Sequence, residues 1–335
     1  MKISTIRYGE ATQLACASPS GRGLLLLQAA FEAAGLGRAP ATMRTLIAGG
    51  PDALAQVRRS IEHAEAHPDK ASYVREDAVV WLPPVPDPTK IVGVAMNNKR
   101  LNSTAHVEPA GPMFFLKPPS SLIGHGGDIE ISDDYGFTFP ELELGVVIGR
   151  RAKRVSIDDA LDHVFGYTII NDITSQGLKR GDSIAIDVTP EQKRSPGYKE
   201  YFDWRRENGE QDLSIYFTYH ARSKGADTFG PMGPYITTAD EIRDPDALEV
   251  RGYSDGEEFA RDTTANYSYP VRQIISHASR YFTMEPGDII SCGTAALGNA
   301  RFPRAHHEID MSRMTPVVDI EIEGLGRLSN RVTHI

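Results

Sequence analysis

The sequence predicts a mixed α/β fold, mainly β, in which a small N-terminal α+β domain precedes a β-rich body. Its length of 335 residues exceeds the roughly 150 residues of a typical domain, which favours one large domain with a smaller one attached. The stretch 83–88 holds four prolines in six positions, so it can continue neither a helix nor a central strand and is typical of a linker. After this linker, short strand-like runs separated by glycine, proline and aspartate dominate the chain.

Residues 1–85 are expected to form the small domain. A short strand is predicted near its start, around Ile3, Ile6 and Tyr8. Helical spacing of apolar residues predicts three helices, at 23–34, 43–48 and 54–64. We place the boundary at the proline-rich linker, so that residues 86–335 form the body.

The body is expected to be a barrel-like or sandwich-like arrangement of short strands. These strands are predicted at 90–95, 113–116, 142–148, 166–170, 214–219, 235–237, 248–253, 288–292 and 317–322. Helical spacing occurs only at 157–163 and 270–281, so repeated βαβ units are not expected. The polar stretch 180–211 is interpreted as a long insertion or lid, because long loops in compact domains are often functional; an irregular surface loop is the alternative.

Composition excludes several classes of partner. Acidic residues number 45 against 36 basic ones, whereas nucleic-acid binding needs a surplus of lysine and arginine. Two cysteines, Cys16 and Cys292, are too few for a disulfide framework, which favours a reducing, cytoplasmic location. The longest leucine run, 24–27, is far shorter than the ~18 apolar residues of a membrane span. We therefore expect neither a nucleic-acid nor a membrane partner.

Three acids at strand positions predict a metal site. Residues two apart on a strand face the same way, so Glu141 and Glu143 present two carboxylates to one side, just before an apolar run. An edge strand with a solvated acidic face would show the same pattern. Asp172, however, ends a second apolar strand and is well placed to meet the pair. Three carboxylates without histidine or cysteine suit Mg²⁺ or Mn²⁺, which could chelate a 2-oxo acid and stabilise its enolate.

The order of several motifs resembles the fumarylacetoacetate hydrolase superfamily. The matching segments run from about residue 90 to 325: Phe114–Pro118, Glu141–Gly149, Gly166–Asp172, Lys224 with Phe229–Pro234, Glu285–Ile290, and Gly293 with Thr294. This resemblance implies a β-rich barrel or roll around a Mg²⁺ or Mn²⁺ site, usually in a homodimer, acting on a small 2-oxo or β-diketo acid. The N-terminal residues 1–85 would then be the variable domain.

Carried over residue by residue, the resemblance assigns Glu141, Glu143 and Asp172 as metal ligands. Lys224 would be the catalytic lysine that contacts a carboxylate or enolate oxygen, and Gly293 and Thr294 would contact the substrate. A desolvated ammonium beside an enolate stabilises charge that develops in the transition state. A surface lysine is the alternative for Lys224.

The chain departs from the family's pattern where hydrolytic members carry a water-activating His-Glu pair. Leu101 and Thr104 occupy those two places. His106 and Glu108, a few residues downstream, are candidates for a shifted base and its orienting acid if their loop folds over the metal. Gln176 stands where relatives carry an arginine and is a substrate-binding candidate.

Further candidates come from positions near these motifs. Arg100 and Lys117 could bind a second substrate carboxylate, and His125 lies among glycines that permit close approach of the backbone. A structural role is the alternative for each. His306 and His307 could chelate a metal, but adjacent residues on a strand point to opposite faces, so we expect a solvated loop there.

The first functional hypothesis is a divalent-metal-dependent hydrolase that cleaves a carbon–carbon bond in an acylpyruvate-like acid through a metal-stabilised enolate. The alternative is a lyase on the same site, either an oxaloacetate-type decarboxylase or a dehydratase or isomerase of a 2-keto-3-deoxy acid. Decarboxylation needs no water-activating base, whereas a dehydratase would need a glutamate where Met113 stands. A third hypothesis, a non-catalytic binding protein, is disfavoured by the retained acids and Lys224.

Overall fold

A twelve-stranded sheet forms the backbone of the molecule in the computed structural model, which describes residues 1–335 except 104–108, 204, 207–208 and 210. Strands contribute more residues than helices, which confirms the mixed, mainly β fold class. Along the sheet the order is β4 (Tyr73–Val74), β3 (Leu24–Leu26), β2 (Ala11–Ala17), β1 (Lys2–Tyr8), β16 (Gly230–Thr238), β12 (Val164–Asn171), β11 (Leu142–Ile148), β19 (Ile289–Thr294), β6 (Ile91–Ala95) and β7 (Met113–Lys117). Two short strands join from the side, β5 (Val80–Trp81) on β1 and β8 (Leu122–Ile123) on β16.

A second sheet of five strands packs against the first within the body. Its order is β18 (Glu257–Thr263), β17 (Glu249–Ser254), β20 (Val317–Ile322), β21 (Gly326–His334) and β9 (Ile129–Ile131). Apolar residues of β11, such as Leu142 and Leu144, share one buried cluster with Val250, Ile320 and Leu328 of this sheet. Every residue of β11 is buried, as expected for a strand with packed elements on both faces.

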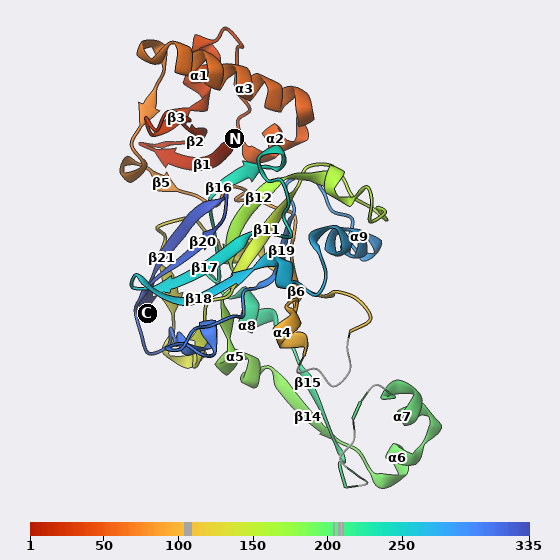
Figure 1. Cartoon of the computed structure of the whole chain (residues 1–335). Coiled ribbons are helices and arrows are strands. Elements are labelled where there is room, and N and C mark those ends of the chain that lie inside the picture. The colour runs from red at the N-terminus through yellow and green to blue at the C-terminus, as the bar shows by residue number, and fades with distance from the viewer. Residues whose placement is uncertain (104–108, 204, 207–208, 210) are drawn as a thin grey trace.

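The N-terminal strands continue the body's sheet. Strand β1 pairs antiparallel with β16, and Lys2 lies opposite Thr237. A second buried cluster contains Ile3 and Phe31 of the N-terminal unit together with Val147 and Met232 of the body. Figure 1 shows this unit, with α1 (Leu27–Ala33), α2 (Met43–Ala48) and α3 (Gly50–Ala66), at the end of the molecule opposite β14 and β15. The boundary at residue 85 stays a prediction.

The expected insertion, 180–211, continues into the strand predicted at 214–219, which belongs not to the body but to a two-stranded hairpin that extends away from it (Figure 1). Its strands are β14 (Ser183–Asp187) and β15 (Ser214–Thr218), with α6 (Pro190–Arg194) and α7 (Pro196–Tyr201) between them. It lies between α5 (Gln176–Gly181) and α8 (Ala221–Gly225), where Arg222 Nε donates to Asp182 at 2.9 and 3.1 Å. The remaining elements are α4 (Lys99–Asn102), α9 (Val271–Tyr281) and the small β10–β13 pair (Thr138–Phe139 and Thr174–Ser175). No helix among the described residues is long and apolar enough to cross a membrane.

Asp288, directly before β19, ties the start of that strand to the start of its parallel neighbour β6. Its fully buried carboxylate accepts from Thr89 N at 2.9 Å, Thr89 Oγ1 at 2.6 Å and Lys90 N at 3.1 Å. The other oxygen accepts from Lys90 Nζ at 2.5 Å and Glu285 N at 2.8 Å. One side chain therefore satisfies three backbone donors where the chain enters the body.

The variant Asp288→Ala is expected to lower the free energy of unfolding by about 2 kcal/mol, because three backbone N–H groups lose the buried carboxylate that accepts from them. Urea unfolding followed by circular dichroism measures this change. Asp87→Ala, a change at an exposed aspartate nearby, is the control and should stay close to wild type. Equal stability of the two variants would contradict the role assigned to Asp288.

Candidate metal centre

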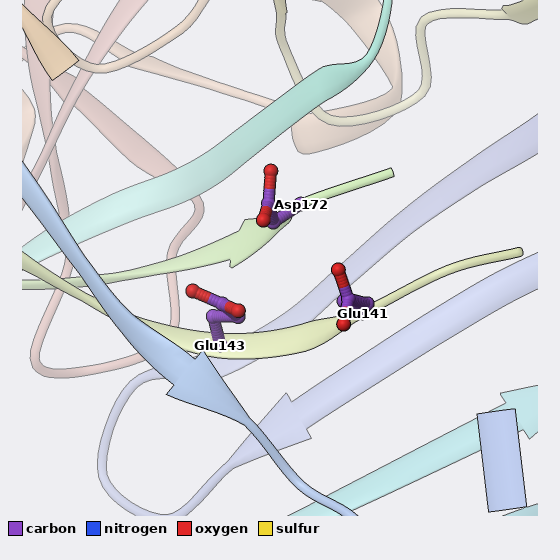
Figure 2. Close-up of side chains that lie close together, drawn as sticks. All are labelled: Glu141, Glu143 and Asp172. Carbon is purple, nitrogen blue, oxygen red and sulfur yellow. The ribbon is translucent and has the colours of Figure 1, made fainter. Parts of the chain in front are cut away.

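Three carboxylates meet where strands β11 and β12 lie side by side. Glu141 stands one residue before β11, Glu143 lies within it, and Asp172 follows directly after β12. The antiparallel register places Leu142 opposite Asn171, so the beginning of one strand lies beside the end of the other. One carboxylate oxygen from each acid lies within 4.8 Å of the others. Figure 2 shows the three side chains grouped around a common space.

Local hydrogen bonds hold Glu141 and Asp172 beside each other. The backbone N–H of Asp172 donates to the Glu141 carbonyl at 2.9 Å, and the N–H of Glu141 donates to Asn171 Oδ1 at 3.0 Å. Thr174 Oγ1 then donates to Glu141 Oε2 at 2.5 Å. The backbones of the two acids are therefore held together, and a neutral hydroxyl fixes the Glu141 carboxylate.

Glu143 is held from the opposite side by β19. Ser291 Oγ donates to its Oε2 at 2.5 Å and the N–H of Gly293 donates to the same oxygen at 3.0 Å. Gly293 has φ of 113°, and a Cβ there would lie 2.7 Å from Asn97 Cβ. Only glycine fits this position without strain, and this backbone conformation is the one in which the N–H of residue 293 reaches Glu143.

The electrostatics of this cluster favour a cation. Burial, together with the charges of Asp172 and Glu141, raises the pKa of Glu143 to about 8. A buried carboxyl beside two others is costly to ionise unless a positive charge is supplied. An all-oxygen ligand set of this kind fits Mg²⁺ or Mn²⁺ in its chemistry. The three acids can therefore hold a divalent cation.

Lys224 brings a positive charge to the same cluster. Its ammonium, on α8, donates to Asp172 Oδ2 at 2.5 Å and to Glu141 Oε2, and it lies 4.9 Å from the centre of the Phe115 ring. Burial alone would lower the pKa of Lys224, but the charges of Asp172 and Glu141 raise it above its usual value. The ammonium is therefore charged and lies directly at the carboxylates.

Lys117 is a second buried cation with a different environment. From the end of β7, its ammonium donates to Asp172 Oδ1 at 2.7 Å, to the Phe229 carbonyl at 3.0 Å and to the carbonyl of Lys224. These three acceptors use all three of its N–H bonds, and its side chain is 1 % exposed. Binding of a substrate carboxylate by Lys117 would require it to give up one of these bonds.

Thr294 lies beside one of the carboxylates, whereas Gln176 begins the helix that follows Asp172, and both make backbone hydrogen bonds. Thr294 is opposite Glu143 across the sheet; its Oγ1 accepts from Leu142 N at 3.0 Å and donates to the Ala295 carbonyl at 3.1 Å. Gln176 is the first residue of α5, and its N–H donates to the Phe137 carbonyl at 2.8 Å. Within the described part of the chain no hydrogen bond holds its side-chain amide, which is therefore available to a ligand.

Arg100 and His125 form their hydrogen bonds and ring contact with residues other than the three carboxylates. Arg100 is on α4, where Nη2 reaches the Pro303 carbonyl at 3.5 Å. His125 Nδ1 accepts from Ser329 N at 3.1 Å, and its ring packs edge-on against Trp81 at 5.6 Å, beside the N-terminal unit. The proposed base pair, His106 and Glu108, lies outside the described residues.

Two histidines that we expected in a solvated loop lie near the site instead. Residues 305–308 form a 3₁₀ turn, and His306 is 1 % exposed, so that expectation is wrong for His306. His307 is half-buried, and Glu141 and His307 each shift the other's pKa. The sequence signal that could have indicated burial is the pair of apolar residues on either side of the histidines, Ala305 and Ile309, both of which are buried.

Residues 90–333 match the family described as fumarylacetoacetate (FAA) hydrolase, C-terminal. The chain belongs to the fumarylacetoacetate hydrolase family. The oxaloacetate tautomerase YisK of Bacillus subtilis is 30% identical over 302 residues, covering 88% of this chain and 87% of the relative. The mitochondrial oxaloacetate tautomerase fahd2 of Xenopus laevis is 29% identical over 297 residues, covering 88% and 79%.

Solved structures of the fumarylacetoacetate hydrolase family share the fold. Maleylpyruvate hydrolase from Sphingobium sp. SYK-6, in complex with manganese(II) and pyruvate, superposes with a TM-score of 0.69 over 100% of this chain and 99% of that one, at 22% identity. Fumarylacetoacetate hydrolase from Exiguobacterium antarcticum gives 0.68 over both complete chains, at 23% identity. The expected family and its fold are thus confirmed, and these named relatives are enzymes.

Proposed function

We propose that this protein is a divalent-cation-dependent enzyme that forms the enolate of a small 2-oxo acid. The observation that carries the proposal is the position of the Lys224 ammonium. It forms ion pairs with Asp172 and Glu141, two of the three clustered carboxylates. Two positive charges, one from lysine and one from a bound cation, would then lie beside the same three carboxylates. Such a site is built to stabilise an oxyanion that develops during reaction.

Each residue has a definite part in this proposal. Glu141, Glu143 and Asp172 would hold Mg²⁺ or Mn²⁺, which when bound supplies Lewis-acid polarisation of a 2-oxo acid. Lys224 donates a hydrogen bond to the oxygen on which negative charge grows. Gln176, whose amide is free, is a candidate to bind the substrate's carboxylate.

Keto–enol interconversion of an oxaloacetate-type acid is the reaction we place first. It needs the enolate stabiliser and one proton-transfer group, and the names of two relatives with extensive coverage support it. Carbon–carbon hydrolysis of an acylpyruvate, the first hypothesis from sequence, shares the enolate step but also needs a group that activates water. We place this hydrolysis second, with decarboxylation of the same acid as a further outcome of the test.

The experiment compares oxaloacetate with acetylpyruvate in the presence and absence of Mg²⁺. Ultraviolet absorbance follows the enol, and trapped carbon dioxide reports decarboxylation. We expect Mg²⁺-dependent equilibration of the oxaloacetate enol, abolished by EDTA. Cleavage of acetylpyruvate would instead establish the hydrolase, carbon dioxide release would establish the decarboxylase, and inertness to both despite Mg²⁺ binding would contradict the proposal.

The variant Lys224→Met is expected to lower kcat by about 10²–10³-fold, because one preorganised charged donor to the oxyanion is lost. Mg²⁺ affinity should persist, since Asp172 and Glu141 no longer share their charge with the ammonium. Calorimetric titration with Mg²⁺ and initial rates with oxaloacetate measure the two quantities. Lys179→Met, on the neighbouring helix α5, is the matched control; an unchanged kcat in Lys224→Met would remove the lysine from the mechanism.

A further inference from the structure

Two adjacent imidazoles lie against the aromatic residue that leads into the carboxylate cluster. Phe139 stands two residues before Glu141 and is buried. The ring of His306 lies 5.5 Å from the Phe139 ring, and the ring of His307 packs edge-on against the same phenyl at 4.6 Å. The two imidazole centroids are 4.2 Å apart. The 3₁₀ turn 305–308 therefore places both rings against the residue that stands two positions before Glu141.

His306 is locked in one orientation. Its Nδ1 lies 3.1 Å from the Ala295 carbonyl. A carbonyl only accepts, so Nδ1 carries the hydrogen and Nε2 is left as an acceptor. Nε2 is buried without a hydrogen-bond partner. Burial and the neighbouring His307 lower the pKa of His306 to about 3, so this ring stays neutral.

The anchor of His306 lies directly after β19, the strand that pairs with β11. Ala295 follows Thr294 at the end of β19, and its N–H donates to the carbonyl of Leu142 at 3.0 Å. Leu142 lies between Glu141 and Glu143. His306 thus has a rigid connection to the backbone of the metal ligands.

His307 is the imidazole that responds to the cluster. Burial lowers its pKa, while the charge of Glu141 opposes this effect. Of the described histidines, it is the one whose pKa is shifted by a carboxylate of the cluster; His220 responds to Lys179 and Lys224, and His125 to Asp319 and Glu76. His307 is also half-buried, so its ring is not sealed in the core as that of His306 is.

We propose that His307 is the proton-transfer residue of the active site and that His306 positions it. This inference rests on the proposed enolate chemistry. A free nitrogen of His307 takes the proton from the carbon next to the substrate's 2-oxo group. The electrons of that C–H bond form the carbon–carbon double bond, and the carbonyl electrons move to oxygen, which Lys224 stabilises. Return of the proton from the imidazolium to oxygen completes the enol, so no other reactant is needed.

The first test is His307→Gln, which keeps a polar side chain but cannot carry the proton. We expect kcat to fall by about 10²–10³-fold, as for loss of a general base, with KM for oxaloacetate little changed. Hydrogen–deuterium exchange at C3 of pyruvate in D₂O, followed by NMR, should fall by the same factor. The control is His163→Gln. The Nδ1 of His163 lies 3.3 Å from the carbonyl of Arg150, and this variant should leave both rates unchanged.

The second test separates positioning by His306 from simple folding. His306→Gln retains a donor for the Ala295 carbonyl, whereas His306→Phe fills the space without one. We expect His306→Gln to keep more of the exchange rate than His306→Phe, while both bind Mg²⁺ as wild type does. Equal rates in these two variants would overturn the positioning role.

A readout independent of turnover is the reaction of His307 with diethylpyrocarbonate, mapped by mass spectrometry. We expect Mg²⁺ with oxalate, a planar mimic of the pyruvate enolate, to protect His307 and not His163. If wild type exchanges the C3 proton but His307→Gln does so equally well and His307 is not protected, this inference fails alone. If wild type neither binds oxalate with Mg²⁺ nor exchanges the proton, the proposed function itself fails.

Discussion

Replacing Glu143 with glutamine is expected to remove the binding of Mg²⁺ or Mn²⁺ while leaving the metal-free protein folded. Glutamine keeps the shape of the side chain and can still accept from Ser291 and Gly293, but it cannot supply the charge of a ligand carboxylate. We expect cation affinity to fall by at least about 10²-fold, since divalent cations of this type depend on ionised oxygen ligands. Calorimetric titration measures the affinity, and the rate with oxaloacetate should fall with it.

The raised pKa of Glu143 predicts that cation binding by the wild-type protein releases a proton. With a pKa of about 8, the carboxyl is mostly protonated near neutral pH in the metal-free protein, so cation binding must release a proton. Titrations in buffers of different ionisation enthalpy should show this release in wild type. Binding by wild type without proton release near pH 7 would contradict the raised pKa.

The same group makes the stability of the metal-free protein depend on pH. A carboxyl whose folded pKa is raised binds its proton more tightly in the folded state, so stability is lost as pH rises above the ordinary value. For Glu143 the window runs from 4.5 to about 8. We expect the wild-type Tm in EDTA to fall across this window more steeply than that of Glu143→Gln, and equal slopes would contradict the assignment.

The central strands were predictable because their sequences are unbroken apolar runs. Strand β11 was expected at 142–148 and has those bounds, since both of its faces are buried. Strand β21 was missed, because its inward positions include a polar residue. The side chain of Asn330 is buried there and donates to the carbonyls of Gly124 and Gly127 at 2.8 Å each. A period-two apolar pattern cannot reveal a position whose polarity is satisfied by a distant turn.

The pairing of strands that are distant in sequence could not be predicted from the hydrophobic pattern either. Strand β1 was expected near the start of the chain, but its partner β16 lies more than 200 residues away in sequence, with Ile3 opposite Ile236. Strand propensity describes one segment at a time, whereas this pairing is decided by the buried cluster that the two segments share. The relation of the N-terminal unit to the body therefore required the structure.

For the site, strand patterns predicted the three acids on two strands but not the two histidines brought in by the 3₁₀ turn. Glu141 and Glu143 followed from the alternation of side chains along a strand. His306 and His307 were judged by that same alternation, but the segment is a 3₁₀ turn, in which neighbouring side chains can lie against one phenyl ring. The local rule failed because the secondary structure assumed for it was wrong.

Lys117→Met is expected to destabilise the metal-free protein by about 3–5 kcal/mol, the usual cost of leaving a buried charge without its partner. Asp172 is fully buried and would keep only the ammonium of Lys224 as a counter-charge. The carbonyls of Phe229 and Lys224 would each lose a donor as well. Urea unfolding in EDTA measures the effect, with Lys153→Met, a change at an exposed lysine, as the control.

The double variant Lys117→Met/Asp172→Asn separates the charge from the packing. If the cost of Lys117→Met comes mainly from the orphaned carboxylate, neutralising Asp172 should recover much of the lost stability, since interacting residues give non-additive changes. Additive losses would instead assign Lys117 a packing role. The comparison with Lys224→Met is then informative. Among the described residues the ammonium of Lys224 bonds to the carboxylates of Glu141 and Asp172, whereas that of Lys117 bonds to one carboxylate and two backbone carbonyls. Mg²⁺ can replace the charge of either lysine, but it cannot replace those carbonyl bonds, so added Mg²⁺ should restore the stability of Lys224→Met more fully than that of Lys117→Met.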